Sequence, residues 1–387
     1  MQSRKREQHV AVFGESGSGK TVMLSSFYGA MQEPQFRKDS LFDVLAESAG
    51  QNTRLVQSYL GMKNSNRVPE TDRFSGTSYT FSIKMKARPE ARGMNSGAPD
   101  ALRLVWHDYP GEWFEEDVSG PEEAQRRVDT FKALLRSDVA LLLVDGQRLL
   151  DQAGEEERYL KSLLTNFHNG LLSLKDDLLE DGKRLVKFPR IWVMALSKAD
   201  LLPDLDVNKF SELLIEKAGD DINDLREVIA GLVEAPDALS VGEDFMLLSS
   251  AMFNANKIEV TERVGLDLIL PMAAVLPFER HVRWAQLKLL PGQVSERLLG
   301  AGAVGAAGLA SALLGSRVRL PALLQGFIGV ALSRGLLDDA ARLAGDRLRE
   351  INADAVAKHN YMTATLTGFR MDLEKGEKEK ILLRSRR

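Results

Sequence analysis

Apolar residues occur along the front of this chain in two patterns. Short continuous apolar runs lie at residues 9–14, 139–144, 191–196 and 245–248. Such runs are typical of strands that are covered on both faces. Between them, apolar residues recur at helical spacing over residues 19–31, 122–136, 153–181 and 206–233. Strands that alternate with helices predict a mostly parallel sheet with right-handed crossovers.

Two segments interrupt this alternation. Residues 78–86 alternate polar and apolar side chains, and a loop rich in Gly, Pro, Asn and Ser joins them to an apolar run at 102–107, so the two predict a hairpin. Residues 32–73 are polar, and their apolar positions have the spacing of helices: Leu41, Val44, Leu45, Leu55, Val56 and Leu60. The expected fold class is therefore α/β with a mostly parallel sheet and helical insertions at about 32–70 and 153–185.

The strand pattern ends near Pro277. A helix is expected at 279–290, followed by an uncharged stretch, residues 298–316, with five Gly and six Ala among residues 299–315. Residues 320–333 are again uncharged. We therefore expect an α/β domain over 1–278 and an α-helical domain over 279–387, which ends in a charged tail.

Composition narrows the function classes. The chain has 387 residues, no cysteine and five histidines without metal-ligand spacing, which excludes disulfides and cysteine chemistry and argues against a zinc site. Residues 1–9 lack the apolar core of a signal peptide, so a cytoplasmic protein is expected. The net charge of −4 is uneven, because residues 279–350 carry ten basic and six acidic side chains. This basic excess is small and lacks interleaved aromatics, so no nucleic-acid partner is expected.

The strongest motif is a glycine-rich loop between the first strand and the first helix. Gly14 to Thr21 fits GxxxxGK[ST], the P-loop pattern, in which backbone N–H groups surround a phosphate at the start of a helix. Lys20 is expected to bridge the β- and γ-phosphates, and the Thr21 hydroxyl to bind Mg²⁺. The nucleotide-binding residues expected here are Gly14, Glu15, Ser16, Gly17, Ser18, Gly19, Lys20, Thr21 and Val22.

A second motif follows the strand at 102–107, in the sequence WHDYPGEW. Asp108 ends that strand, where its carboxylate can reach Mg²⁺ through water, and Gly111 can offer its N–H to the γ-phosphate. Together with Lys20, the residues Gly111 and Glu112 are the catalytic candidates.

A third motif follows the strand at 191–196, and a fourth the strand at 245–248. Asp200, in Ser197-Lys198-Ala199-Asp200, can accept hydrogen bonds from N1–H and N2–H of guanine, whereas adenine presents an acceptor at N1. The stem of Lys198 would lie along the base. Ser250 and Ala251 are candidates to present a backbone N–H to the guanine O6.

These four motifs, in this order, resemble the P-loop GTPases of the translation-factor and Ras-like (TRAFAC) class over residues 9–265. Within that class, DYPGEW is most similar to the YcjX family of bacterial stress-associated GTPases. The resemblance implies that a threonine before the 78–86 strand closes over Mg²⁺; Thr71 is favoured and Thr77 is the alternative. Glu112 stands where Ras-like members carry the water-orienting glutamine, which implies slow GTP hydrolysis. Ser197 stands where an asparagine or threonine is usual.

Three functions remain open at this stage. The first is a switch that binds GTP and GDP with Mg²⁺ and hydrolyses GTP slowly. The second is a non-enzymatic scaffold or membrane-associated assembly protein that responds to nucleotide. The third is a P-loop ATPase, if Ser197 marks a degraded base site.

Residues 298–333 point to a partner of unknown kind. The two uncharged runs in this segment, interrupted by Arg317 and Arg319, would if exposed be larger than the apolar patches that soluble monomers tolerate. It is therefore expected to be covered by the α/β domain, by a second copy or protein partner, or by lipid at the inner face of the membrane. Small residues four positions apart suit close helix packing, but Ala and Gly contribute little insertion energy.

Overall fold

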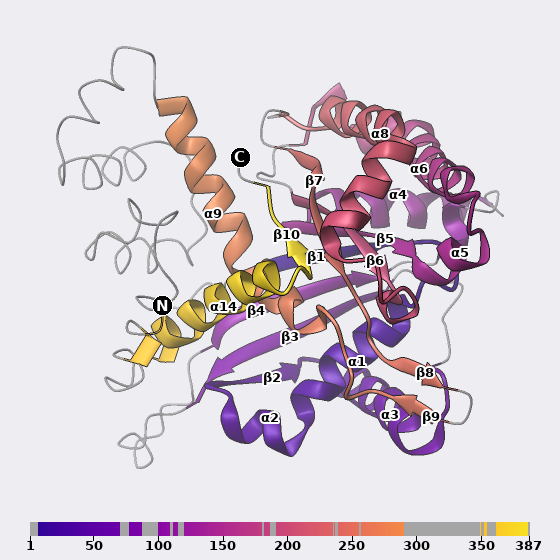
Figure 1. The fold of residues 1–387 in the computed structure, drawn as a ribbon. Helices are drawn as coiled ribbons and strands as arrows, with labels where there is room; N and C mark the ends of the chain where they lie inside the picture. The colour runs from indigo at the N-terminus through magenta and orange to yellow at the C-terminus, as the bar shows by residue number, and fades with distance from the viewer. Residues whose placement is uncertain are drawn as a thin grey trace.

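A computed structural model describes residues 7–69, 77–86, 100–108, 111–114, 120–179, 182–185, 191–234, 236, 239–254, 257–289, 349, 352–353 and 361–385 (Figure 1). Its centre is an eight-stranded sheet in the order β10-β7-β6-β5-β1-β4-β3-β2. The strands of this sheet are β1 (Glu7–Phe13), β2 (Phe42–Ala46), β3 (Thr77–Met85), β4 (Asp100–Asp108), β5 (Val139–Asp145), β6 (Ile191–Ser197), β7 (Ser240–Leu247) and β10 (Leu382–Leu383).

The helices are α1 (Lys20–Gln32), α2 (Pro34–Asp39), α3 (Ala49–Ser65), α4 (Pro121–Leu135), α5 (Gly146–Asp151), α6 (Glu156–Ser173), α7 (Lys175–Leu178), α8 (Val207–Leu232), α9 (Ile269–Leu289) and α14 (Tyr361–Lys378). Short 3₁₀ turns are η2 (Gly111–Phe114), η4 (Ala199–Leu201) and η6 (Leu266–Leu268), and β8 (Met252–Asn254) pairs with β9 (Lys257–Glu259) in a separate hairpin.

The middle of the sheet is parallel, and its edges are antiparallel. β4, β1, β5, β6 and β7 run in the same direction, whereas β3, β2 and β10 run against their neighbours. Every residue of β5 and β6 is buried, as their continuous apolar runs predict. The expected α/β class with a mostly parallel sheet is confirmed.

Side chains of successive strand residues enter two separate cores. Val10 and Val12 of β1 face a core shared with α1, α9 and α14, which we call the first core. Ala11 and Phe13 face a second core shared with α6 and α8. Helices thus cover both faces of the parallel strands (Figure 1). This layering leaves the loops at the strand ends to form a site.

The helical interpretation of residues 32–73 is wrong in its middle. The segment contains β2, which pairs antiparallel with β3 so that Val44 lies opposite Ile83. Phe42 and Val44 face the first core, and Leu45, which follows Val44, is exposed. This period of two extends over only five residues, and the helical spacing of the flanking apolar residues hides it. The helix expected around Leu55 is present as α3.

β7 begins at Ser240, earlier than expected, and the β8–β9 hairpin follows it. The expectation that strands end before Pro277 is wrong. Near the end of the chain, β10 pairs with β7, with Leu382 opposite Met246. The ring of Phe369 in α14 lies 5.5 Å from that of Phe42. Residues 361–385 therefore return to the α/β unit.

A buried ion pair fastens this return. Arg280 Nη2 of α9 lies 2.5 Å from Asp244 Oδ1 of β7, and the Ser385 backbone N–H donates to the same oxygen at 2.9 Å. The Asp244 side chain has no exposed surface. Burial raises the pKa of its carboxyl, and the Arg280 guanidinium opposes this shift.

The predicted boundary at residue 278 falls inside α9, which continues to Leu289. The Gly/Ala segment at 298–333 lies outside the described residues, so a separate helical domain there stays a prediction. Within the described ranges, no helix is both long and apolar enough to cross a bilayer.

Candidate nucleotide site

The candidate residues lie together along one edge of the sheet, the edge formed by the carboxyl ends of the parallel strands. Because β1, β4, β5, β6 and β7 are parallel, their carboxyl ends all reach this edge. These strand ends and the loops that follow them carry the P-loop, Asp108, Asp145, the Ser197–Asp200 motif and Ser249. β3 runs the other way, so its first residue, Thr77, meets Asp108 in register at the same edge. The fold therefore collects residues that are far apart in the chain.

The P-loop adopts a curled backbone that only glycine takes easily. Gly17 and Gly19 have φ angles of 80° and 91°, in the left-handed region. The Ser18 N–H donates to the Glu15 carbonyl at 3.2 Å, and the Met23 N–H to that of Gly19 at 2.8 Å. Gly19 is the N-cap of α1. The loop thus ends at the positive end of a helix, where anions bind.

The Lys20 side chain folds back over the loop. Its Nζ donates to the Gly14 carbonyl at 2.6 Å and to the Glu15 carbonyl at 3.0 Å, and the residue is buried. Two carbonyl oxygens thus hold the ammonium in the loop. Thr21 and Val22 are half-buried in the first turn of α1.

Gly111 lies directly against the P-loop. A Cβ atom built on Gly111 would be 2.3 Å from the Ser16 nitrogen and 2.5 Å from the Glu15 carbonyl carbon. Such distances leave no room for a side chain, so glycine permits this approach of the second motif. Register supports the approach, because Ala11 of β1 pairs with His107, next to Asp108.

The turn after Gly111 is anchored by a residue that the sequence did not indicate. Arg127 of α4 donates from Nη1 to the Trp113 carbonyl at 2.9 Å, and its guanidinium carbon lies 5.8 Å from the centre of the Trp113 ring. Trp113 is buried in the second core. The Glu112 side chain and the whole of Thr71 lie outside the described residues, so their expected roles stay predictions.

The two charged side chains of the Ser197–Asp200 motif, the candidate base motif, are hydrogen-bonded to neighbouring elements, Lys198 as a donor and Asp200 as an acceptor. Lys198 Nζ lies 2.8 Å from Asp145 Oδ2, and Asp200 Oδ1 accepts from the Ser249 hydroxyl at 2.6 Å. The Ala199 N–H donates to the Leu248 carbonyl at 3.0 Å. The loops after β5, β6 and β7 are therefore bonded to one another.

Ser197, which stands where an asparagine or threonine is usual, does not bond this loop to the P-loop. Its hydroxyl donates instead to the Val144 carbonyl at 3.3 Å. The serine side chain is too short to reach further than the neighbouring strand. The link to the P-loop comes from α5, through Arg148 and Glu15.

Ala251 lies at a junction of three elements. It is buried with Tyr59 and Met62 of α3, and Val22 of α1 packs against the same cluster. Nearby, Asn66 Oδ1 accepts from the Ile258 N–H at 3.0 Å, so the β8–β9 hairpin is bonded to the end of α3. Ser250 is half-buried. The base loop thereby contacts the insertion that leads toward Thr71.

The sequence did not indicate that the start of α5 belongs to the candidate site. Asp145 caps this helix, accepting from the Gln147 N–H at 2.9 Å, and a Cβ on Gly146 would be 2.6 Å from the Ser197 carbonyl oxygen. Arg148 Nη1 lies 2.6 Å from Glu15 Oε2 of the P-loop. One signal was available, because Asp145 ends an apolar strand as Asp108 does.

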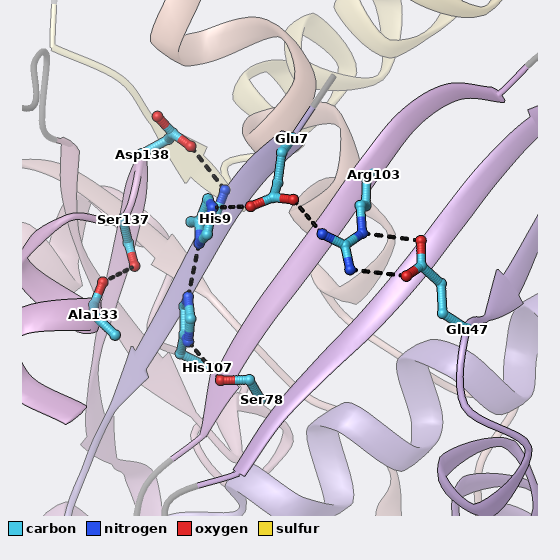
Figure 2. A network of polar contacts seen from close by, with 9 residues as sticks. All are labelled: Glu7, His9, Glu47, Ser78, Arg103, His107, Ala133, Ser137 and Asp138. Atoms are coloured by element: carbon cyan, nitrogen blue, oxygen red, sulfur yellow. Dashed lines mark hydrogen bonds and ion pairs between the residues drawn. The ribbon is translucent and has the colours of Figure 1, made fainter. Parts of the chain in front are cut away.

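Behind the site, a polar network ties β1, β3 and β4 together (Figure 2). His9 Nδ1 lies 2.8 Å from His107 Nε2, and His107 Nδ1 lies 2.8 Å from the Ser78 hydroxyl oxygen. Arg103 bridges Glu7 and Glu47 across the same face. The pKa of the Glu7 carboxyl is lowered. Burial by itself would raise this pKa, but hydrogen bonds from Arg103 and His9 lower it. The network fixes the strands from which the P-loop and Asp108 emerge.

The sequence matches a known protein family over more than half of its length. A sequence model described as Double-GTPase 2 matches residues 8–239. No curated protein matches the chain significantly.

Two solved structures resemble parts of the fold. One is the signal recognition particle receptor SRb-GTP/SRX complex from Chaetomium thermophilum, with 17% identity, a TM-score of 0.33, and coverage of 64% of this chain and 93% of that one. The other is nucleolar GTP-binding protein 1 from Plasmodium falciparum, with 14% identity, a TM-score of 0.31, and coverage of 77% and 97%. At these TM-scores no functional argument rests on either structure.

Proposed function

The chain belongs to the Double-GTPase 2 family, and from this premise we propose that it binds GTP with Mg²⁺ and hydrolyses it slowly, as a conformational switch. One observation carries the proposal: the P-loop, Asp108 and the loop of Asp200 all lie at the carboxyl ends of the parallel strands. Family membership itself supports GTP binding. Hydrolysis, the metal and the switch are the proposed extensions.

The P-loop residues hold the phosphates in this proposal. The left-handed glycines Gly17 and Gly19 orient successive N–H groups into the loop. Lys20 moves from the carbonyls of Gly14 and Glu15 onto the phosphate oxygens. Since phosphoryl transfer depends mainly on positioning and charge neutralisation, these groups and the metal carry most of the chemistry.

Thr21 and Asp108 fit a magnesium site. Thr21 is in the first turn after the P-loop, and Asp108 ends the strand beside β1, which supports a hydroxyl and a carboxylate near the proposed phosphate position. Both are oxygen donors, which Mg²⁺ prefers in combination with phosphate and water. Bound there, the ion would neutralise charge on the phosphates. Thr71 is the proposed third protein ligand.

Gly111 and Glu112 form the proposed nucleotide-sensing turn. The contact of Gly111 with the P-loop backbone supports a role in which its N–H donates to the γ-phosphate. Loss of the γ-phosphate would remove a partner of this N–H and change the turn that Arg127 anchors at Trp113. A carboxylate at Glu112 adds negative charge beside the γ-phosphate, which supports slow hydrolysis.

Asp200 is the proposed base reader. Ser249 holds one carboxylate oxygen of Asp200, which orients the other toward the base. The neighbouring Lys198 is paired with Asp145. Ser197, Ser250 and the Ala251 amide complete this part of the site. The likeness of the DYPGEW sequence to the YcjX family is a narrower proposal within the same function.

Partners and location extend the proposal beyond the described residues. Residues 298–333 are proposed to contact a second copy or another protein, with the inner membrane face as the alternative. Liposome co-sedimentation and sedimentation velocity, each with GDP and with a non-hydrolysable GTP analogue, test both. The same result in both nucleotide states, with no lipid binding and no change in mass, would contradict a nucleotide-dependent contact.

The proposed function is tested by two assays on purified protein. Displacement of a fluorescent GTP analogue by GTP, GDP and ATP measures which nucleotide binds, and phosphate release measures hydrolysis. We expect guanine nucleotides to compete and ATP not to. Equal competition by ATP would favour the ATPase, and tight GTP binding without phosphate release would favour the scaffold.

A further inference from the structure

The P-loop carries a buried acid. Glu15 is its second residue, and the Glu15 side chain is only 7% exposed. A loop that binds phosphate offers N–H groups, and a carboxylate in it repels a polyanion. Repulsion between buried charges is weakly screened by salt. A loop with this residue therefore needs a compensating cation.

Arg148 of α5 supplies that cation. Its Nη1 lies 2.6 Å from Glu15 Oε2, and its Nη2 donates to the Ser16 carbonyl at 3.3 Å. One guanidinium thus neutralises the second residue of the loop and holds the backbone of the third. Arginine suits this task because its planar fork can serve two acceptors at once, which an ammonium does less well.

The start of α5 is itself fixed in place. The Asp145 N–H donates to the Tyr159 hydroxyl at 2.8 Å, and Asp145 Oδ2 accepts from Lys198. Burial raises the pKa of the Tyr159 hydroxyl, and the negative charge of Glu15 raises it further, so this phenol stays protonated. Arg148 follows three residues after Asp145 and therefore extends from a support that also holds the base motif.

We propose that Arg148 is a positioning residue that lets the P-loop accept a triphosphate in preference to a diphosphate. It acts by neutralising Glu15 and by holding the Ser16 carbonyl. The inference rests on the nucleotide binding proposed above. GTP has an additional charged phosphate, so a Glu15 carboxylate without Arg148 penalises GTP more than GDP.

A double-mutant cycle tests this. Dissociation constants for GTP and GDP are measured with Mg²⁺ for wild type, Arg148→Ala, Glu15→Gln and the double variant. Arg148→Ala should weaken GTP binding about 10-fold and GDP binding less, because it removes the guanidinium that lies 2.6 Å from the buried Glu15 carboxylate. Glu15→Gln in the Arg148→Ala background should restore GTP affinity to within about 2-fold of wild type.

Two further variants complete the design. Arg158→Ala is the matched control, since the side chain of this α6 arginine is 83% exposed and lies 3.4 Å from the exposed Glu155 carboxylate; it should change neither affinity. Arg148→Lys keeps the charge and should preserve most of the preference for the triphosphate. If Arg148→Ala does not fold, Arg148→Lys and the double variant provide the comparison.

The outcomes separate this inference from the proposed function. ATP and ADP are titrated in parallel, and the inference is judged on the triphosphate-to-diphosphate ratio of whichever base binds. Equal loss for both nucleotides without rescue by Glu15→Gln, or no loss, overturns the role of Arg148 while leaving nucleotide binding intact. Wild-type protein that binds no nucleotide overturns both.

Discussion

The hydroxyl of Ser249 donates to Oδ1 of Asp200 at 2.6 Å, across 49 residues of sequence. This bond joins the loops after β6 and β7 and fixes the rotamer of the carboxylate expected to meet the base. Only one carboxylate oxygen is taken up by Ser249 in this bond. The arrangement makes Asp200 a prepared acceptor rather than a solvated surface charge.

Asp200→Asn should therefore reduce the preference for guanine. An amide can turn a donor toward the N1–H, and each unsatisfied buried group costs about 1–3 kcal/mol, so GTP affinity should fall about 10- to 100-fold. Competition binding with GTP and ATP measures it. Asp204→Asn, at an exposed position four residues on, is the control. Unchanged selectivity in Asp200→Asn would show that another residue reads the base.

Lys20→Ala should abolish nucleotide binding without unfolding the protein. The Lys20 ammonium is the P-loop's own cation, and its Nζ donates to the backbone carbonyls of Gly14 and Glu15. Its loss removes charge from the phosphate position but little apolar packing. Titration with a fluorescent GTP analogue measures binding, and circular dichroism measures folding. Wild-type affinity in a folded Lys20→Ala protein would remove the P-loop assignment.

Gly111→Ala should slow hydrolysis while GDP binding is largely kept. The new methyl group would lie 2.3 Å from the Ser16 nitrogen, so the turn must move away from the P-loop. Misplacement of about 1 Å near a reacting group can cost about 100-fold in rate. Single-turnover phosphate release measures the change. Gly120→Ala is the control, because nothing lies within 4 Å of a Cβ there. Similar rates for the two variants would contradict the account.

Asp244→Ala should destabilise the fold. It leaves Arg280 buried without the carboxylate 2.5 Å away and frees the Ser385 N–H, and breaking a buried pair costs about 3–5 kcal/mol. Chemical denaturation measures the free energy of unfolding. Glu216→Ala removes the exposed partner of Lys217 and should change it by less than about 1 kcal/mol. Equal effects would mean that the C-terminal return contributes little.

Local signals in the sequence predicted much of the site. The P-loop from Gly14 to Thr21 is contiguous, and the strands at 139–144 and 191–196 are apolar throughout, so both could be recognised without tertiary information. Their parallel order then placed Asp108 and Asp200 at the same edge. Local composition and connection rules were sufficient for these features.

Long-range pairing explains what was missed. Arg148 and Glu15 are 133 residues apart, and neither belongs to a motif that predicts the other. β2 has five residues and β10 two, too short for a period of two to stand out. β10 also follows a charged helix, so only its contact with β7 identifies it. Such contacts depend on the assembled sheet.

The most direct test of the account is the identity of the nucleotide that the purified protein binds and turns over. Nucleotide released from the protein by denaturation is identified by chromatography, and phosphate release is followed with GTP and with ATP in the presence of Mg²⁺. The account predicts bound GDP or GTP and slow phosphate release from GTP that Lys20→Ala abolishes. Bound adenine nucleotide, or phosphate release from ATP at the rate seen with GTP, would contradict it.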